Sequence, residues 1–555
     1  MKTSRRNFFQ TLGAGAAGLG LTSIPFVSNA SDMSFQDNDG QQLQIGDSIA
    51  IADTKYGKVK GFILRGINCY RGIPYGADTS GKNRFMPPQP PKAWSNILPA
   101  VWWGNTAPQI MDNRYANAYS SFVDHWNYDD VSEDCLKLNI WTPAIDKKKR
   151  PVLVWLHGGG YTNGNGIEQD GYDGENLSRK GNIVFVSINH RLGPIGFSDL
   201  SIAGGSKYAD SGNVGALDMV AALEWVRDNI ANFGGDPNNV TIMGQSGGGA
   251  KVCVLMAMPK AKGLFHKAVP LSGSAVKATD QNLSQKLGGY IMKEAGLNAS
   301  EIDKLQEMPW KDYIVLANKA AQKFAAENAG SGMRGSFSPV ADGANIPVGQ
   351  FFSDASGLSS DVPMLISTTF HEWGMARTMP EMENITAEKA KEMLKERAGF
   401  GGGLGDKAGV VYDAYAKIYP NAKPIEIMTM ASSNRKGAIE TANAKSVQKS
   451  PVYLAWFGWQ PPLFDNRMRA FHCLDICFWF ANTDLMLTHT GGGKRPRALS
   501  EKMSGTLLQF MKTGNPNKGG LPEWKAYTPT KGETMVLNDQ SMLKDDPDRE
   551  ARKLI

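Results

Sequence analysis

The chain has few cysteines and no strong excess of either charge. Only five of its 555 residues are cysteine, a sparse and odd set that matches neither a disulfide framework nor a zinc-binding pattern. Lysine and arginine number 60 against 54 aspartate and glutamate residues, so the composition does not indicate a nucleic-acid partner or an anionic membrane surface. We expect all five cysteines to be buried or half-buried thiols: Cys69, Cys135, Cys253, Cys473 and Cys477.

The sequence also lacks a comfortable membrane-spanning run. Its N-terminal thirty residues contain Arg5 and Arg6 in "SRRNFF", then a weakly apolar, glycine-rich stretch, then a small-x-small sequence ending at Ala30. This order is typical of a twin-arginine export signal cleaved after Ala30, and the apolar stretch is too short and glycine-rich to favour a span. We therefore expect a bacterial periplasmic or secreted protein without a stable membrane span; retention of the signal as an anchor is the alternative.

Apolar segments of strand length alternate with segments of helical periodicity. Residues 151–160 ("PVLVWLHGGG") and 182–193 ("NIVFVSINHRLG") are typical of strands buried on both faces, and residues 216–233 of an amphipathic helix. Further strands are expected in 49–70, 240–243, "KAVPLSGS" and "VPMLISTT", and further helices near 282–295, 387–397 and 499–512. The alternation predicts an α/β fold with a large, mostly parallel sheet. We expect a single domain over residues 31–555, with N-terminal antiparallel strands and helical insertions.

One serine stands among glycines between an expected strand and an expected helix. The sequence from Gly244 to Gly248 ("GQSGG") fits the G-x-S-x-G nucleophile elbow, in which a sharp turn exposes the oxygen of Ser246 above the sheet. A phosphate-binding loop would require a different spacing, ending in G-K-[ST], which the sequence after Gly249 lacks. A turn without chemistry is the remaining alternative.

A second glycine motif supports the chemical interpretation. His157-Gly158-Gly159-Gly160 ends an expected buried strand, as does the HGGG motif of esterases, whose N–H groups stabilise a tetrahedral oxyanion. Together with the N–H of Gly247, those of Gly159 and Gly160 would form an oxyanion hole with three donors.

These motifs occur among longer blocks that together resemble the type-B carboxylesterase family, which includes para-nitrobenzyl esterases and cholinesterases. The blocks include "SEDCLKLNIWTP", "HGGGY" and "GNVGALDMVAALEWVRDNIANFGGDPNNVTIMGQSGG", and the resemblance runs from about Gly57 to Asn538. It implies the α/β-hydrolase fold and ester hydrolysis.

A serine hydroxyl needs a histidine to take its proton. In α/β-hydrolases this histidine follows the serine in the chain, which leaves His266, His371, His472 and His489. The residues alone do not rank His472 against His489. The resemblance implies His472, because "RAFHCLDICFWF" is similar to the catalytic histidine segment of the family, and we expect His489 to be a solvated loop residue.

The acid that orients the histidine is also implied by the resemblance. "STTFHEWG" is similar to the family segment in which a strand end presents a triad glutamate, here Glu372. Asp342 is the rival, although aspartate before glycine is ordinary turn chemistry. We expect no catalytic role for His371, because adjacent side chains diverge.

Several positions depart from or complete the family pattern. Gln245 stands where the family commonly has glutamate, and Ala107 where it often has a cysteine partner for Cys135, so Cys135 is expected to be free. Glu133 and Arg191 match positions of structural ion pairs in the family.

The leading hypothesis is a serine carboxylesterase that forms a covalent acyl-enzyme on a small-molecule ester, with the triad Ser246, Glu372 and His472. It implies no metal and no organic cofactor, and no oligomeric state is predicted. The alternatives are a lipase acting on longer acyl chains, a non-catalytic binding or adhesion module on the same fold, and a cofactor-bearing oxidoreductase, which the export route alone suggests.

Overall fold

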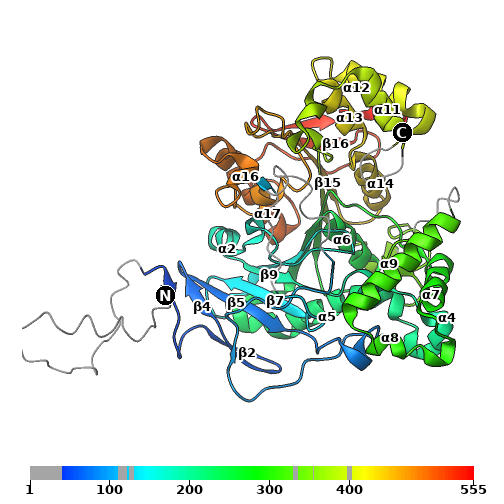
Figure 1. Cartoon of the computed structure of the whole chain (residues 1–555). Helices are drawn as coiled ribbons and strands as arrows, with labels where there is room; N and C mark the ends of the chain where they lie inside the picture. The colour runs from blue at the N-terminus through cyan, green and yellow to red at the C-terminus, as the bar shows by residue number, and fades with distance from the viewer. Residues whose placement is uncertain (1–40, 111–121, 124–129, 329–334, 354–355, 397–402) are drawn as a thin grey trace, which may run out of the picture. The chain divides into compact units, whose positions relative to one another are not determined.

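The apolar segments of the chain assemble into one sheet of twelve strands (Figure 1). The computed structural model describes residues 41–110, 122–123, 130–328, 335–353, 356–396 and 403–555. The expected export signal and the boundary at Ala30 lie outside these residues. In spatial order the strands are β1 (Leu43–Gln44), β4 (Phe62–Leu64), β5 (Ile67–Pro74), β7 (Lys137–Thr142), β9 (Val184–Ile188), β8 (Arg150–Leu156), β10 (Gly235–Gln245), β11 (Lys267–Leu271), β14 (Met364–Thr369), β15 (Val452–Phe457), β16 (Glu533–Leu537) and β17 (Met542–Asp545).

The middle of this sheet is parallel and its edges are antiparallel. The run from β9 through β8, β10, β11, β14 and β15 to β16 is joined by parallel pairs, whereas β1, β4, β5 and β7 pair antiparallel at one edge and β17 at the other. Each residue of β9 is buried, as is nearly all of β8. The predicted α/β fold with a mostly parallel sheet and N-terminal antiparallel strands is therefore confirmed.

Two smaller sheets accompany the large one. β2 (Ile51–Thr54), β3 (Gly57–Lys60) and β6 (Leu98–Pro99) form the first, and β12 (Thr279–Asp280) pairs with β13 (Val340–Ala341) in the second. The strands expected between Ile49 and Tyr70 are thus divided between two sheets.

Helices cover the sheet and extend beyond it (Figure 1). The longer ones are α2 (Glu175–Gly181), α5 (Val214–Asn229), α6 (Gly247–Ala257), α7 (Gln281–Ala295), α9 (Trp310–Glu327), α11 (Ala387–Glu396), α12 (Ala408–Ile418), α13 (Pro424–Ala431), α14 (Arg435–Ser446) and α17 (Lys494–Thr513). Short helices are α3 (Gly193–Phe197), α4 (Ser201–Gly204), α8 (Lys304–Glu307), α10 (Ser356–Ser359), α15 (Ile476–Trp479), α16 (Leu487–Thr490) and α18 (Arg549–Arg552). The expected helices correspond to α5, α6, α7, α11 and α17, while α9, α12, α13 and α14 were not predicted.

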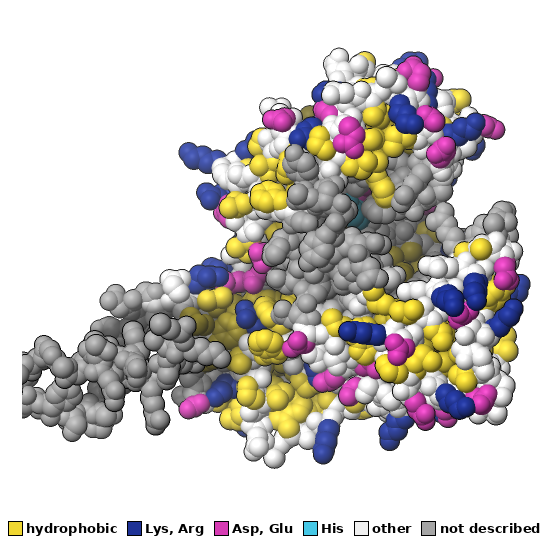
Figure 2. All heavy atoms as spheres, in the orientation of Figure 1, with side chains coloured by type: hydrophobic (Ala, Val, Ile, Leu, Met, Phe, Trp, Pro, Cys, Tyr) yellow, Lys and Arg dark blue, Asp and Glu magenta, His cyan; other side chains and the backbone are white. Residues whose placement is uncertain are grey.

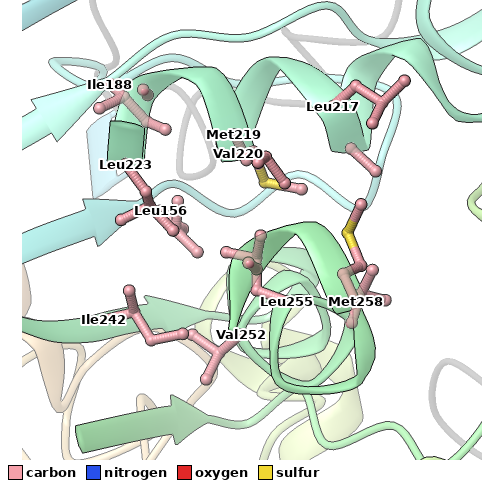
Figure 3. Packing of buried hydrophobic residues seen from close by; sticks show 14 of the residues in the cluster. Leu156, Ile188, Leu217, Met219, Val220, Leu223, Ile242, Val252, Leu255 and Met258 are labelled. Carbon is pink, nitrogen blue, oxygen red and sulfur yellow. The ribbon is translucent and has the colours of Figure 1, made fainter. Parts of the chain in front are cut away.

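The helix that follows Ser246 is held in the largest hydrophobic core. Helix α6 is almost entirely buried, which places its apolar side chains against α5 and the strands β8 and β10. Figure 3 shows residues from both helices and both strands gathered there: Leu217, Met219, Val220, Leu223, Val252, Leu255, Leu156 and Ile242. Burying one such side chain contributes about 1.5–3 kcal/mol to the free energy of folding. This packing therefore fixes the position of the helix that begins directly after Ser246.

The surface carries charges of both signs. Figure 2 shows Lys and Arg side chains interspersed with Asp and Glu over the visible face, without a large patch of one sign. Among the described helices, none is long and apolar enough to cross a membrane.

Candidate active site

The backbone at Ser246 has the strained geometry that a nucleophile elbow requires. Strand β10 ends at Gln245, α6 begins at Gly247, and Ser246 between them has φ 58° and ψ −124°. Such a conformation costs about 1–3 kcal/mol for a residue with a side chain and persists only where its surroundings enforce it. Here the Ser246 N–H donates to the carbonyl of Leu271 on β11 (2.8 Å) and its carbonyl accepts from Ala250 (3.1 Å).

Glycine is required around the serine because backbones meet there. A Cβ on Gly248 would lie 2.0 Å from the carbonyl oxygen of Leu156, and one on Gly244 would lie 2.4 Å from that of Gly248. The elbow is therefore pressed against the end of β8, the strand that leads into the second glycine motif.

The two glycine motifs are in direct contact. A Cβ on Gly247 would lie 2.1 Å from the carbonyl oxygen of Gly160, and the first N–H of a helix has no acceptor within that helix. Gly159 and Gly160 are exposed and have φ values of 79° and 64°, which glycine adopts without strain. Among the described residues, no backbone acceptor pairs with the N–H of either glycine. Gly160 thus lies against the residue that follows Ser246, as the predicted oxyanion hole requires.

Glu372 and His472, 100 residues apart, form a hydrogen-bonded pair. Nδ1 of His472 lies 2.5 Å from Oε2 of Glu372, whose carboxylate is completely buried and whose other oxygen accepts from the Thr369 N–H (3.0 Å). The backbones of the two loops are also joined, because His472 N–H donates to the Glu372 carbonyl (3.1 Å) and His371 N–H to that of Ala470 (3.0 Å). The carboxylate therefore fixes the proton on Nδ1 and leaves Nε2 for other partners.

Gln245 connects this pair to the elbow. Its amide nitrogen lies 3.1 Å from Nε2 and 3.3 Å from Nδ1 of His472, and its oxygen accepts from the thiol of Cys473 (3.2 Å). Because Gln245 directly precedes Ser246, these contacts bring the imidazole to the elbow. The side chain of His472 is 16% exposed, so it is sheltered but accessible.

Several ionisable groups are buried behind the site. His157, whose Nδ1 lies 2.9 Å from the Gly158 carbonyl oxygen, stacks on His190 with ring centroids 5.0 Å apart, and burial holds the pKa of both far below the usual value. Lys251 is fully buried and burial lowers its pKa to about 7. Burial, followed by the nearby Glu372 carboxylate, raises the pKa of Asp475 to about 7.

The rival histidines and the rival acid have other partners. His489 is buried in α16 with Nε2 3.1 Å from the Val123 carbonyl oxygen and its ring against Phe471, so the expectation of a solvated loop residue is wrong: aromatic packing encloses it. Asp342 accepts hydrogen bonds from three successive N–H groups, those of Ala344, Asn345 and Ile346, as a turn residue does. His371 points away to Thr429 (3.0 Å), as expected.

Glu133 and Arg191, which were expected to belong to structural ion pairs, do form ion pairs. Glu133 binds Arg84, with Nε and Nη2 each 2.5–2.6 Å from a carboxylate oxygen, and Arg191 binds Asp218 with both side chains fully buried. None of the five cysteines forms a disulfide; four of them are buried and Cys473 is half-buried. This confirms that Cys135 has no disulfide partner.

The model of the carboxylesterase family matches residues 48–554. The chain belongs to the carboxylesterase family. This carboxylesterase is 34% identical over 508 residues to the para-nitrobenzyl esterase of Bacillus subtilis (strain 168), covering 91% of this chain and 98% of that protein. It is 30% identical over 504 residues to the phenmedipham hydrolase of Pseudarthrobacter oxydans, covering 88% and 95%.

Solved structures agree with this assignment. An esterase from the anaerobe Clostridium hathewayi, described as able to hydrolyse aliphatic aromatic polyesters, superposes on this carboxylesterase with a TM-score of 0.76 at 32% identity, covering 92% of this chain and 98% of that one. A para-nitrobenzyl esterase structure gives a TM-score of 0.74 with 91% and 99% coverage. The fold is the α/β-hydrolase fold, and the protein is a carboxylic ester hydrolase.

Two residues of this carboxylesterase site were not found from the sequence. Lys251 donates to the carbonyl of His157, and Asp475 is buried near the Glu372 carboxylate, yet neither was considered. A lysine inside the apolar stretch "AKVCVLMAM" was the available signal for Lys251, because a charged residue within a buried helix is rarely left without a partner.

Proposed function

We propose that this carboxylesterase hydrolyses small carboxylic esters through a covalent acyl intermediate on Ser246. The observation that carries the proposal is the hydrogen bond between Glu372 and Nδ1 of His472, at an imidazole held beside the elbow by Gln245. An imidazole whose Nδ1 proton is held by a carboxylate can accept a proton at Nε2.

In the acylation half of the reaction, Nε2 of His472 takes the proton of the Ser246 hydroxyl. The serine oxygen then forms a bond to the ester carbonyl carbon, and the carbonyl electron pair moves to the oxygen. The N–H groups of Gly159, Gly160 and Gly247 stabilise this oxyanion. When the oxyanion collapses, the bond to the alcohol breaks, and the alcohol leaves with the proton from His472.

The deacylation half repeats these steps with water. His472 takes a proton from water, the hydroxyl adds to the acyl carbon, and the second tetrahedral intermediate expels Ser246, which recovers its proton. Glu372 remains ionised throughout and stabilises the imidazolium. Every proton that His472 accepts is returned, so the cycle needs no metal and no redox partner.

The decisive experiment replaces the nucleophile. Ser246→Ala is expected to abolish hydrolysis of p-nitrophenyl butyrate and labelling by a fluorophosphonate probe, while the circular dichroism spectrum remains that of the wild type. Hydrolysis retained by this variant would overturn the proposal. Because relatives bear the names para-nitrobenzyl esterase and phenmedipham hydrolase, a panel of aryl esters and carbamates, extended to esters of longer acyl chains, would define the substrate class and test the lipase alternative.

The same proposal includes export. Arg5 and Arg6 precede a glycine-rich apolar stretch that ends at Ala30, which supports a twin-arginine signal and a mature periplasmic or secreted enzyme. Expressed in a bacterium with a functional twin-arginine pathway, the wild-type chain should yield periplasmic activity with a new N-terminus at Ser31. Replacing Arg5 and Arg6 by lysine should retain the enzyme in the cytoplasm; unchanged export would contradict the signal.

A further inference from the structure

A lysine is buried beside the oxyanion glycines, and no acid in the described part of the chain forms a hydrogen bond with it. Lys251 lies on α6 with no exposed surface, and its ammonium donates to the carbonyl oxygen of His157 at 2.9 Å. The ammonium also lies 5.9 Å from the centre of the Tyr161 ring. His157 and Tyr161 are the residues immediately before and after Gly158, Gly159 and Gly160, so one amine contacts both ends of the glycine segment.

The helix carries this lysine on the face that meets the glycine segment. Gly247 and Lys251 are four residues apart, and Gly248 and Lys251 three, so all three lie on one side of α6. Gly247 touches the backbone of Gly160, and Gly248 touches the carbonyl oxygens of Leu156 and His157. The first turn of α6 therefore supplies the N–H of Gly247, a predicted donor to the oxyanion. The next turn supplies Lys251, which donates to the carbonyl of His157.

The glycine segment has other contacts besides the lysine. Nδ1 of His157 lies 2.9 Å from the Gly158 carbonyl oxygen, and the Gly159 carbonyl accepts from the N–H groups of Thr162 (3.2 Å) and Asn163 (3.0 Å). Lys251 acts directly before the glycines, at the His157 carbonyl. His157 and His190 are stacked behind it, and among the described residues neither Nε2 atom has a hydrogen-bond partner. The negative charge of Glu168 acts to raise the pKa of Lys251, against the larger effect of burial. One oxygen of Glu168 accepts a hydrogen bond from the Tyr172 hydroxyl (2.7 Å). The glycines themselves have no side chains to pack. A segment that glycine makes pliable needs an external contact to fix the direction of its N–H groups.

We propose that Lys251 is a positioning residue of the oxyanion hole, and that its contact with the His157 carbonyl fixes the direction of the Gly159 and Gly160 N–H groups. The proposal rests on the proposed function, since it assumes that these glycines hold the oxyanion. Burying an amine is costly, and a structural hydrogen bond could be made by a neutral side chain.

The test separates transition-state stabilisation from folding. Lys251→Met keeps the length of the side chain but removes the donor. A trifluoromethyl ketone adds to the serine oxygen and places an oxyanion in the hole, whereas KM for p-nitrophenyl butyrate reports mainly on the ground state. The active sites are counted by titration with a fluorophosphonate, and kcat is expressed per active site. We expect this kcat to fall about tenfold to a hundredfold, which is less than the loss caused by removing an oxyanion donor outright. The inhibition constant of the ketone should rise by the same factor, with KM within twofold of the wild-type value.

The chain provides a matched control at a distance from the site. Lys445 on α14 is also fully buried and donates to a backbone carbonyl, that of Ser359, at 2.9 Å. Lys445→Met removes this contact together with a hydrogen bond to Oε1 of Gln448 (2.6 Å). It should lower the melting temperature without changing kcat per active site or the affinity for the ketone.

Wild-type kcat and ketone affinity per active site in Lys251→Met would overturn the proposal, whatever its melting temperature. If Lys251→Met does not fold, Lys251→Gln, which retains a shorter N–H donor, is assessed by the same two measurements: a smaller loss in both is expected, and wild-type values in both overturn the proposal. The proposed function fails separately, if Ser246→Ala still hydrolyses the ester. An inactive Ser246→Ala beside an unaffected Lys251 variant refutes only the role of the lysine.

Discussion

Oε2 of Glu372 accepts a 2.5 Å hydrogen bond from Nδ1 of His472, and the backbone of His472 donates in turn to the carbonyl of the same glutamate. The two residues are thus joined by side chain and main chain together. This double connection fixes both the distance of the ring from the acid and its orientation. At His489, by contrast, Nε2 lies 3.1 Å from the Val123 carbonyl oxygen and the ring packs against Phe471.

Replacing Glu372 by glutamine should therefore disable the imidazole while leaving the loops in place. An amide cannot hold the proton on Nδ1 or stabilise the imidazolium, so kcat should fall about 10³- to 10⁴-fold with KM little changed. Asp342→Asn is the control, because this acid accepts hydrogen bonds from the N–H groups of its own turn and from the side-chain amides of Asn213 and Asn345. Its kcat per active site should equal that of the wild type, with a lower melting temperature. A large loss in Asp342→Asn, or little loss in Glu372→Gln, would reverse the assignment.

Gln245 should set the pH dependence of the reaction. Its amide nitrogen lies within 3.3 Å of both nitrogens of His472, so Gln245→Glu would place a carboxylate there. A negative charge at this distance favours the protonated imidazole, which is inactive as a base. The acid limb of the kcat/KM profile should therefore move up by about one pH unit. Gln245→Met, which adds no charge, should leave the limb in place, and an unmoved limb in Gln245→Glu would contradict this role.

The close approach of α6 to β8 predicts which glycine cannot be replaced. A Cβ on Gly248 would lie 2.0 Å from the Leu156 carbonyl oxygen, so Gly248→Ala must push the elbow helix away from the oxyanion segment. We expect a loss of stability of about 1–3 kcal/mol and a fall in kcat of more than tenfold. Gly289 in α7 has open space around it, so Gly289→Ala should stabilise the helix by up to about 1 kcal/mol and leave kcat unchanged. Denaturant unfolding and active-site titration would measure both effects.

The sequence identified the elbow and the oxyanion segment because their chemistry requires glycine at fixed local spacing. Ser246 and Gly160 could be found in this way, since the constraints act within a few residues. The choice between His472 and His489 could not be made from the residues, because both follow the serine and only their three-dimensional surroundings differ. The family resemblance favoured His472, and the contact with Glu372 agrees with it.

Elements whose stability depends on distant contacts were harder to predict. The helices α12 and α13 form a separate small core with α11, whereas the apolar side chains of α14 lie in the largest core. In both cases the contacts that stabilise the helix come from segments far away in the sequence. Lys251 was missed for a related reason: as one lysine in a helix it suggests an exposed position, and only the packing of α6 against β8 shows that it is buried.

The buried ion pair between Arg191 and Asp218 should be essential for stability and irrelevant to the chemistry. Both side chains are fully buried, and Asp218 accepts from Nη2 (2.6 Å), Nε (2.8 Å) and the backbone N–H (3.0 Å) of Arg191. Asp218→Asn leaves an uncompensated guanidinium in the core, which costs about 3–5 kcal/mol. The free energy of unfolding should fall by this amount, while kcat per titrated site remains that of the wild type. A fall in kcat per site would connect this pair to the active site.

Lys251 should also leave a signature in the pH dependence of stability. Burial lowers its pKa from 10.5 to about 7, so between pH 7 and pH 10.5 the amine is neutral in the folded protein and protonated in the unfolded chain. Unfolding then takes up a proton, and the contribution of this lysine to stability rises with pH by about 1.4 kcal/mol per unit. Methionine has no such dependence.

The stability of the wild type relative to Lys251→Met should consequently increase by about 2 kcal/mol between pH 7.5 and pH 9, as measured by urea unfolding at each pH. Lys445 calibrates the effect, because its burial lowers its pKa to about 8, and the corresponding rise against Lys445→Met should begin about one pH unit higher. A stability difference that stays flat for Lys251 while rising for Lys445 would mean that the amine beside His157 keeps its proton in the folded enzyme. The positive charge would then be permanent at the oxyanion segment throughout the working pH range of the esterase.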